Sequence, residues 1–541
     1  MPVVKLNNKY LEHLTKTDIN TIRENLPMIG SEIEREDPDQ TDVQFFPNRP
    51  DLYSAEGTAR AMRGFLNIET GLPKYEVKSS GISFSVDPKL ANIRPYLGSA
   101  VIRNLHLNND IIESLMGLQE LLHISIGRNR KKVAIGVHDL DKIKGPFSYI
   151  AADRSTSFVP LDYDIPMTMD KILSEHPKGK KYSKLVEEYP LFPLIHDSNG
   201  NICSFPPIIN GELTKVTDNT KNILLDVTGI EPNSVMMAVN IICTAMIEIG
   251  ATIESVNIDG NITPTLKPTT RIVSVSECNN LIGISINANT MKDLLEKMRF
   301  GVDIIDDDKI KVYIPCYRGD IMHNNDIYED VAIAYGYKNI PAQIPQSFTI
   351  GKPHPVQEIY SLVRNIMVGL SYIENIPFTL TNERISYELM NRPENKDALH
   401  ILHPISEDQK IVRTNILPML MESLSFNRSK ELPQRIFACG DVVERLTTHP
   451  NMSMVTTHPH ADFSEIYAVV DTFCKMASIK YNVVESVDPA FIKGRRGDIY
   501  VNNNKIGVFG EINPEVLVSF GLEHPVAACE IDLSILLPKK L

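Results

Sequence analysis

The sequence of 541 residues contains no apolar run long enough to cross a membrane. A membrane-spanning helix needs about 18 or more consecutive apolar residues, whereas the longest apolar stretch, residues 235–247, is shorter and includes Asn240 and Thr244. The first residues also lack the basic and apolar segments of a secretory signal peptide. We therefore expect a soluble, cytoplasmic protein with no membrane partner.

Paired cysteines and the common nucleotide-binding motifs are also missing. The seven cysteines are scattered and never spaced as C-x-x-C, which argues against a disulfide framework and against a zinc ribbon. Neither a G-x-x-x-x-G-K-[ST] loop nor a G-x-G-x-x-G fingerprint occurs, so the sequence indicates no P-loop and no dinucleotide-binding site. We expect the cysteines to be buried thiols.

An excess of positive charge is absent as well. The 55 Lys and Arg residues are outnumbered by 68 Asp and Glu residues, giving a net charge of −13. A protein that grips nucleic acid over its whole surface needs clustered Lys and Arg to neutralise phosphates. Only local contacts are therefore expected, from four basic clusters that are individually more typical of a solvated surface: Arg60 with Arg63, and residues 128–132, 178–184 and 493–496.

The length and composition that are present indicate several folded domains. At roughly 150 residues per domain, three or four are expected, and the 43% hydrophobic and 23% charged residues are typical of globular chains. We predict a multidomain α+β protein with an N-terminal domain and linker at 1–86, with the linker at 72–86, and a mixed α/β domain at 87–262. A small helix–hairpin–helix module, similar to a winged helix, follows at 268–345, and an α+β domain on an antiparallel sheet occupies 351–541.

Hydrophobic periodicity places the main elements within these segments. Helices are predicted at residues 55–66, 231–242, 290–300, from Asp326, at 356–370 and at 417–427. Strands are predicted at 133–137, 223–227, 302–305, 310–314, 436–439, 466–470 and 505–509.

Four carboxylates form the densest polar constellation of the sequence. Asp320, Asp326, Glu329 and Asp330 lie within eleven residues, and a helix that opens at Asp326 would place Glu329 and Asp330 on the same face as Asp326. Hard oxygen ligands suit Mg²⁺, which usually takes only one or two carboxylates directly. The same acids also fit the capping of a helix N-terminus without any metal, so both interpretations stay open.

A second candidate site follows a rigid Pro-Pro turn. Residues 205–212 read Phe-Pro-Pro-Ile-Ile-Asn-Gly-Glu, and Asp226 stands two residues before Thr228 in a predicted strand. An amide, an acid and a hydroxyl in such positions could line a small pocket with a polar end. Strand ends and turns use the same residue types for structure alone.

Four stretches together resemble the β subunit of phenylalanyl-tRNA synthetase in its archaeal and eukaryotic form, and the resemblance spans nearly the whole chain. They are Phe45-Phe-Pro-Asn-Arg-Pro-Asp51 with the helix after it, residues 204–212 with 226–229, residues 317–337, and His403-Pro-Ile-Ser-Glu-Asp-Gln-Lys to Pro418. The family often has glycine after the last proline, where this chain has Met419.

This resemblance implies a ligase subunit that works with a separate α subunit. Two α and two β chains would attach phenylalanine to its tRNA, with ATP and phenylalanine bound through the α subunit. The C-terminal domain would resemble a class II synthetase module that lacks catalytic motifs, because no G-x-G-x-G-x-x-R motif occurs. We expect it to act as a scaffold.

The resemblance also implies roles for both candidate sites. Asp320, Asp326, Glu329 and Asp330 would bind Mg²⁺, and the domain at 87–262 would hydrolyse tyrosine wrongly attached to the phenylalanine tRNA. The candidate residues of this editing pocket are Ser204, Asn210, Asp226 and Thr228. The alternative is a non-catalytic RNA-binding or assembly scaffold that has lost editing.

Overall fold

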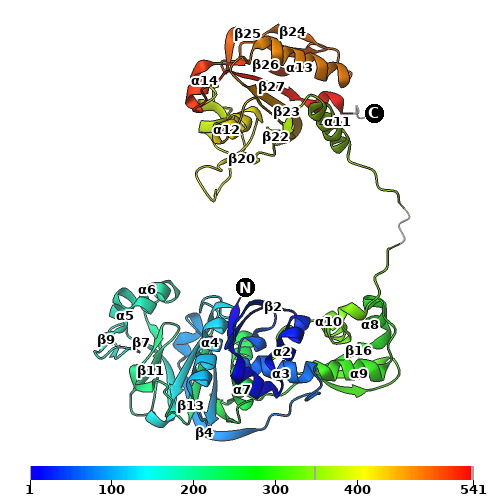
Figure 1. Cartoon of the computed structure of the whole chain (residues 1–541). Coiled ribbons are helices and arrows are strands. Elements are labelled where there is room, and N and C mark those ends of the chain that lie inside the picture. Colours follow the sequence, from blue (N-terminus) through cyan, green and yellow to red (C-terminus); the bar gives the residue numbers. More distant parts are fainter. Residues whose placement is uncertain (1, 346–348, 538–541) are drawn as a thin grey trace. The chain divides into compact units, whose positions relative to one another are not determined.

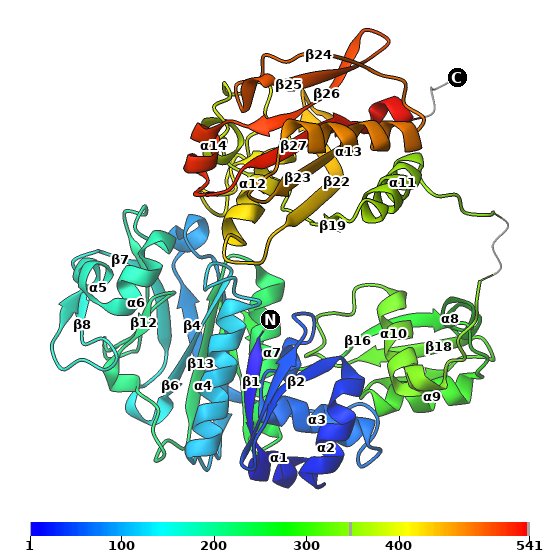
Figure 2. The same ribbon diagram turned by 45° about the horizontal axis from the view of Figure 1, so that its top comes forward.

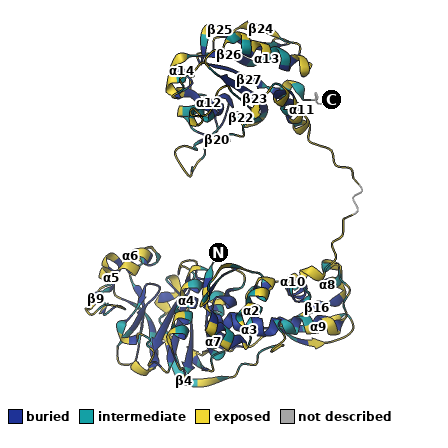
Figure 3. Ribbon diagram, viewed as in Figure 1, coloured by how far each residue is buried: buried dark blue, intermediate teal, exposed yellow. Residues whose placement is uncertain are grey.

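A computed structural model of the chain describes residues 2–345 and 349–537. They belong to two compact units that divide after Ile344, and the elements of each unit can be followed in Figure 1. Each unit has its own hydrophobic core, with buried residues concentrated on the strands and on the helix faces that cover them (Figure 3). In the part of the chain that the structure describes, no helix combines the length and the apolar character needed to span a bilayer.

The first sheet of unit 1 has three antiparallel strands in the order β1-β3-β2, namely β1 (Val3–Asn7), β2 (Ser31–Glu36) and β3 (Gln40–Phe45). Every second residue of β3 is buried, because alternate side chains of a strand point to opposite faces. The helices of this segment are α1 (Asn8–Thr15), α2 (Ile19–Asn25) and α3 (Ala55–Phe65). The helix predicted at 55–66 is thus confirmed, and Ser54 caps it by accepting a hydrogen bond from the Gly57 N–H.

A ten-stranded sheet forms the centre of unit 1. Nine strands follow the order β12-β11-β10-β7-β4-β14-β5-β13-β6, and β15 pairs with β14. The strands are β4 (Val77–Val86), β5 (Tyr96–Arg103), β6 (Val133–Asp139), β7 (Phe147–Ala152), β10 (Phe192–His196), β11 (Ile202–Phe205), β12 (Ile209–Asn210), β13 (Ile223–Gly229), β14 (Thr252–Ile258) and β15 (Asn261–Thr263). The strands predicted at 133–137 and 223–227 are confirmed as β6 and β13.

Two long helices cover this sheet. α4 (Asn109–Ile124) packs on β6, and α7 (Pro232–Ile247) packs on β5 and β13 (Figure 2). The sequence of α7 is apolar on nearly all sides and therefore predicted a buried helix. The structure confirms this, because nine residues of α7 are buried. Two short helices, α5 (Met169–Glu175) and α6 (Pro177–Tyr182), stand beside the small hairpin of β8 (Ser157–Phe158) and β9 (Met167–Thr168).

The linker predicted at residues 72–86 is wrong over most of its length, because Val77–Val86 forms β4. This strand pairs in parallel with β14 and with β7. Gly81, one of the residues that suggested a linker, has a positive φ of 69° and lies where the register with β14 shifts. A glycine tolerates such an irregularity inside a strand. The pairing partners are more than 60 residues away in sequence, so local composition could not reveal them.

The third sheet of unit 1 is small, with the order β16-β18-β17, and comprises β16 (Thr269–Ser274), β17 (Gly301–Ile304) and β18 (Lys309–Ile314). Its helices are α8 (Val275–Ile282), α9 (Ala288–Lys297) and α10 (Asn324–Tyr335). The predicted helix and hairpin are confirmed as α9 and β17–β18, whereas β16 was not expected. Helix α10 starts at Asn324 rather than at Asp326.

Unit 2 is built on a seven-stranded sheet with the order β19-β22-β23-β27-β26-β25-β24. All neighbours are antiparallel except β19 and β22. The strands are β19 (Ile373–Glu374), β22 (Gln434–Glu444), β23 (Thr447–Thr457), β24 (Asn482–Glu485), β25 (Phe491–Val501), β26 (Asn504–Ile512) and β27 (Val526–Asp532), and a separate pair joins β20 (Leu380–Thr381) to β21 (Ile411–Val412).

The helices of unit 2 are α11 (Pro355–Gly369), α12 (Leu417–Phe426), α13 (Phe463–Met476) and α14 (Pro514–Ser519). The strand predicted at 466–470 is wrong, because these residues lie in α13. Asp462 caps this helix by accepting a hydrogen bond from the Glu465 N–H, and its buried residues Ile466, Val470 and Phe473 recur at helical spacing. A five-residue window was too short to separate this period from that of a strand.

Candidate functional site

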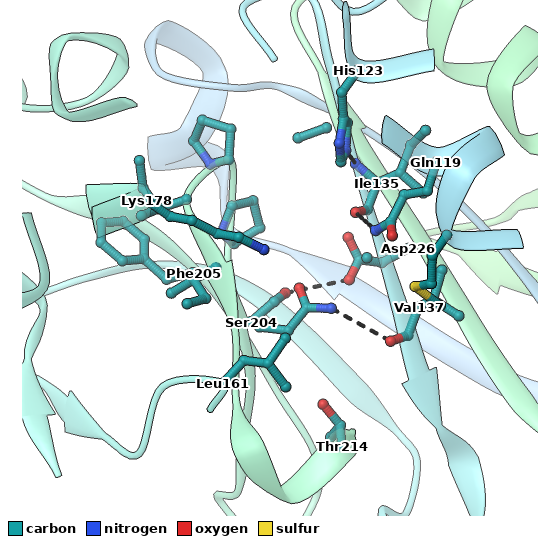
Figure 4. Close-up of a pocket in the computed structure, with 18 of the residues that line it drawn as sticks. Gln119, His123, Ile135, Val137, Leu161, Lys178, Ser204, Phe205, Thr214 and Asp226 are labelled. Carbon is teal, nitrogen blue, oxygen red and sulfur yellow. Dashed lines mark hydrogen bonds between the residues drawn. The ribbon is translucent and has the colours of Figure 1, made fainter. Parts of the chain in front are cut away.

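A cavity of about 380 Å³ lies in unit 1 where the two edge strands of the ten-stranded sheet approach each other. Asn210 Nδ2 of β12 donates a hydrogen bond to the carbonyl oxygen of Val137 on β6 at 3.4 Å. Arg130 Nη1, just before β6, donates to the carbonyl oxygen of Ile208 at 2.9 Å. Side chains thus bridge the two edges of the curled sheet, and the cavity fills the gap between them (Figure 4).

Asp226 lies at the buried end of this cavity. Its side chain comes from β13, in which all seven residues are buried. Ser204 Oγ of β11 donates a hydrogen bond to Asp226 Oδ2 at 3.3 Å, and His138 Nε2 of β6 lies 2.6 Å from the same oxygen. Among the described residues, Asp226 Oδ1 has no hydrogen-bond partner. This oxygen is not among the buried side-chain atoms that lack a partner, so the carboxylate offers one accessible, free acceptor to a ligand in the cavity.

Sequence analysis missed His138, which stands directly behind Asp226. It is fully buried, and its Nδ1 lies 2.8 Å from Thr214 Oγ1. The signal available in the sequence was one histidine in the buried strand Val133–Asp139. That signal does not identify a partner, because the pairing of β6 with β13 joins residues nearly 90 positions apart.

The walls of the cavity are mostly apolar. Phe205, Pro206 and Pro207 form one side, and Phe205 stacks on Phe192 with a centroid distance of 5.3 Å. Further apolar lining residues are Ile112, Met116, Ile135, Val137, Leu161 and Ile209. Such walls suit a flat apolar ring, and the volume is within the range of small-molecule pockets.

Polar side chains gather on the α4 side of the cavity. Gln119 Nε2 donates to the carbonyl oxygen of Ile135 at 2.7 Å, and the Ile135 N–H donates to His123 Nε2 at 2.8 Å. Arg130 Nη2 donates to Glu120 Oε1 at 2.7 Å, and His123 Nδ1 lies 3.5 Å from that oxygen. His123 and then Arg130 lower the pKa of Glu120 to about 2, so this half-exposed carboxylate is ionised at neutral pH.

Three of the four residues predicted for this pocket line it, namely Ser204, Asn210 and Asp226. Thr228 is not among the lining residues. Its Oγ1 accepts a hydrogen bond from Arg94 Nε at 2.9 Å, and its carbonyl oxygen accepts one from Arg94 Nη2 at 2.8 Å. Burial lowers the pKa of the Arg94 guanidinium to about 10. Thr228 therefore supports a buried arginine next to the site.

The four predicted metal ligands line a second cavity, of about 490 Å³, beside α10. Arg318 Nη2 lies 2.6 Å from an oxygen of Asp320 and 2.6 Å from an oxygen of Asp330. Asp326 Oδ2 accepts hydrogen bonds from the N–H groups of Met322 and His323 at 2.7 and 2.6 Å. Asp326 does take part in capping the helix, but as the N3 residue of a capping box whose N-cap residue is His323. The box predicted between Asp326 and Glu329 is wrong, and Glu329 is exposed on the next turn.

The electrostatics of this second cavity are those of a buried arginine–carboxylate cluster. Burial raises the pKa of Asp330 despite the nearby Arg318, whereas at Asp320 the arginine outweighs burial and lowers the pKa. Within the described ranges 2–345 and 349–537, no group of three or more His, Cys, Asp or Glu side chains is arranged to hold a metal ion. Arg318 would therefore compete with a bound cation for Asp320 and Asp330.

Three family models match successive parts of the chain. The B3/4 domain matches residues 103–242, which contain the cavity around Asp226. The tRNA synthetase B5 domain matches residues 272–337, which contain the acidic cluster. The phenylalanyl-tRNA synthetase β chain CLM domain matches residues 340–533.

Whole-length relatives agree with these matches. The chain is 71% identical over 533 residues to the phenylalanine–tRNA ligase β subunit of Methanocorpusculum labreanum, covering 98% of this chain and 99% of the relative. It is 46% identical to the same subunit of Archaeoglobus fulgidus over 99% of this chain and 98% of the relative. A crystal structure of an N-terminal fragment of the phenylalanyl-tRNA synthetase β subunit from Pyrococcus horikoshii matches with a TM-score of 0.60 and 40% identity, covering 62% of this chain and 99% of that chain.

Proposed function

Because the chain belongs to the family of phenylalanine–tRNA ligase β subunits, we propose that its Asp226 cavity hydrolyses tyrosine wrongly attached to the phenylalanine tRNA. The single observation that carries this proposal is the free carboxylate oxygen of Asp226 at the buried end of an apolar cavity. A phenolic O–H donates to such an oxygen, whereas a phenylalanine ring leaves it unsatisfied.

The physical need for a second site follows from the weak selectivity of apolar pockets. A pocket made for phenylalanine rejects an analogue that adds one hydroxyl by only about 100-fold, whereas a site built to bind that hydroxyl discriminates by about 10⁴-fold or more. The Asp226 cavity is of the kind that binds the hydroxyl, because it holds a free carboxylate oxygen at its buried end. Tyrosine enters ring first between Phe205 and Val137, and its phenol reaches Asp226.

Hydrolysis takes place at the opposite end of the bound tyrosine. Water attacks the ester carbonyl carbon, the bond to the ribose oxygen breaks, and that oxygen takes a proton, so free tyrosine and tRNA with a free hydroxyl leave. Asn210 pairs with Ser204 across β11 and β12 and donates its Nδ2 to Val137, so it lies with Asp226 at the phenol end of the cavity. Lys178 lines the same cavity and supplies positive charge for the tRNA phosphates.

The ligase reaction itself is assigned to an assembly with an α subunit, with two copies of each chain, in the cytoplasm. ATP and phenylalanine bind through the α subunit, which is consistent with the missing glycine-rich ATP motif of this chain. Unit 2 exposes large apolar side chains of the kind that mark interfaces, including Ile376, Phe378 and Phe426. These support a role for unit 2 as the scaffold that contacts the partner.

Magnesium is not needed by this mechanism. The prediction that Asp320, Asp326, Glu329 and Asp330 bind Mg²⁺ stays a prediction, because Arg318 already pairs with two of the four acids. No step of the proposed hydrolysis runs through a metal ion.

Tyrosine release by the complete assembly tests the proposal. We would co-express the chain with the α subunit, supply phenylalanine tRNA charged with tyrosine, and compare wild type with Asp226→Ala. Release should fall at least about 100-fold in the variant. Asp218→Ala, which removes an exposed acid of the same domain outside the cavity, should match wild type. Co-purification without release from wild type would leave the non-catalytic scaffold as the function.

A further inference from the structure

His138 contacts two residues that line the proposed site, Asp226 and Thr214. Its ring is fully buried and is not among the residues that line the cavity. The Nε2 atom lies 2.6 Å from Asp226 Oδ2, and Nδ1 lies 2.8 Å from Thr214 Oγ1. The histidine therefore joins the β13 carboxylate to the short helical turn at Glu212–Thr214. Any role it has in recognition acts through these two side chains, and Asp226 is the one with an oxygen free for a ligand.

The direction of these hydrogen bonds follows from the acceptor they share. An ionised carboxylate oxygen only accepts hydrogen bonds, and Asp226 Oδ2 already accepts one from Ser204 Oγ. His138 must therefore donate from Nε2, and its Nδ1 faces Thr214 Oγ1, whose hydroxyl also lies 3.2 Å from the carbonyl oxygen of Gly211. Two donors then hold Oδ2, and only Oδ1 remains for a ligand.

Strand register and a glycine make this pairing possible. Asp226 pairs with Gly136 across β13 and β6, and His138 is two residues further along β6 on the same face. A Cβ atom at position 136 would lie 2.2 Å from Asp226 Oδ2 and 2.7 Å from His138 Nε2. The hydrogen side chain of Gly136 thus leaves the space in which the two side chains meet.

We propose that His138 is a positioning residue for specificity, which fixes the Asp226 carboxylate through Oδ2 so that Oδ1 faces the phenol of tyrosine. This inference rests on the proposed editing function and deepens it. Without the histidine only the 3.3 Å hydrogen bond from Ser204 holds the carboxylate, which weakens the fixed geometry that separates a phenol from an unsubstituted ring.

Two amide substitutions distinguish positioning from simple packing. Glutamine can place an amide N–H near the position of Nε2, whereas asparagine reaches only the position of Nδ1. His138→Gln keeps the donor to Asp226, and His138→Asn keeps only the contact toward Thr214. Asparagine leaves a larger void than glutamine at this buried site, so the release of phenylalanine by the same variants is measured to report a general loss of packing.

The experiment uses the complete α–β assembly and measures release of tyrosine and of phenylalanine from separately charged phenylalanine tRNA. In His138→Asn, tyrosine release should fall roughly 10- to 100-fold, the range expected for losing a hydrogen bond to a charged group, with phenylalanine release unchanged or higher. His138→Gln should stay within about threefold of wild type for both substrates. His196→Gln, a histidine of β10 outside the cavity, should match wild type.

Equal effects of the two His138 variants, or a parallel fall in the release of both amino acids, would overturn the positioning role while leaving the editing function in place. No tyrosine release by wild type would overturn the editing function itself, and this inference with it. Phenylalanine attachment by the same preparations reports that each assembly is folded.

Discussion

The guanidinium of Arg60 lies over the ring of Tyr317, with its central carbon 3.8 Å from the ring centroid. This contact ties α3 to the loop that precedes α10. Arg60 is almost fully buried, and Glu248 Oε1 lies 3.6 Å from its Nη1. The basic pair Arg60 and Arg63, which the sequence favoured as solvated surface, is instead buried inside unit 1.

We expect Tyr317→Leu to destabilise unit 1 by about 2–4 kcal/mol, because it removes the ring over a desolvated cation. Thermal unfolding of the full chain measures the effect on the transition of this unit. Tyr317→Phe is the matched control. The buried hydroxyl has no hydrogen-bond partner among the described residues, so its removal should leave the unfolding midpoint unchanged or raise it. Equal losses in both variants would contradict a role for the ring face.

Two helical glycines should respond in opposite directions to a methyl group. In α3, a Cβ atom at Gly57 would lie 1.8 Å from the carbonyl oxygen of Asp51, so Gly57→Ala forces the backbone apart. In α4, a Cβ atom at Gly117 meets nothing within 4 Å. We expect Gly57→Ala to cost about 1–3 kcal/mol and Gly117→Ala to stabilise by about 0.5–1 kcal/mol, as measured by denaturant unfolding.

Removal of Arg318 should destabilise the chain and raise its affinity for divalent cations. Arg318→Met leaves Asp320 and Asp330 without their shared partner, at an expected cost of about 3–5 kcal/mol. The same change frees two carboxylates beside Glu329, so Mg²⁺ titration followed by calorimetry should show tighter binding in the variant than in wild type. Tighter binding by wild type would show that Mg²⁺ does not compete with Arg318 for these acids.

Acid should weaken unit 1 through His123. Burial lowers the pKa of His123 in the folded chain. Below about pH 6.5 this histidine therefore binds a proton more readily in the unfolded chain than in the folded chain. Stability therefore falls as the pH drops from 7 to 5. His123→Gln cannot titrate, yet its side-chain oxygen can still accept from the Ile135 N–H. The free energy of unfolding at pH 7.5, 6.5 and 5.5 should fall less steeply in this variant, and parallel slopes would contradict the assignment.

Sequence periodicity predicted elements whose burial repeats locally. β6, β13, α7 and α9 each carry a long run of apolar residues at one period, and all four are confirmed. The prediction fails where local and distant signals differ. β4 forms because it pairs with the distant strands β7 and β14. The short apolar run within α13 fits the pattern of a strand as well as that of a helix.

The candidate site was predicted in part for the same reason. Ser204, Asn210 and Asp226 lie near turns and a strand that sequence can locate. His138 and Gly136 join them only through the register of β6 against β13, which sequence does not specify. In the acidic cluster the sequence shows Arg318 two residues before Asp320, so this ion pair could have been predicted. The second ion pair, between Arg318 and Asp330, depends on the tertiary structure that buries Asp330.

The side chains around the cavity also affect how readily the chain aggregates, because they cover the edge strand β6. β6 ends the sheet, and a free strand edge invites another polypeptide to add to it and begin aggregation. In this protein His123 accepts a hydrogen bond from the N–H of Ile135, and Gln119 donates one to the carbonyl oxygen of Ile135. Asn210 donates a hydrogen bond to the carbonyl oxygen of Val137. The side chains around the cavity therefore also occupy the unpaired backbone groups of the edge strand β6. Their loss would damage the pocket and would leave these groups free to pair with another polypeptide.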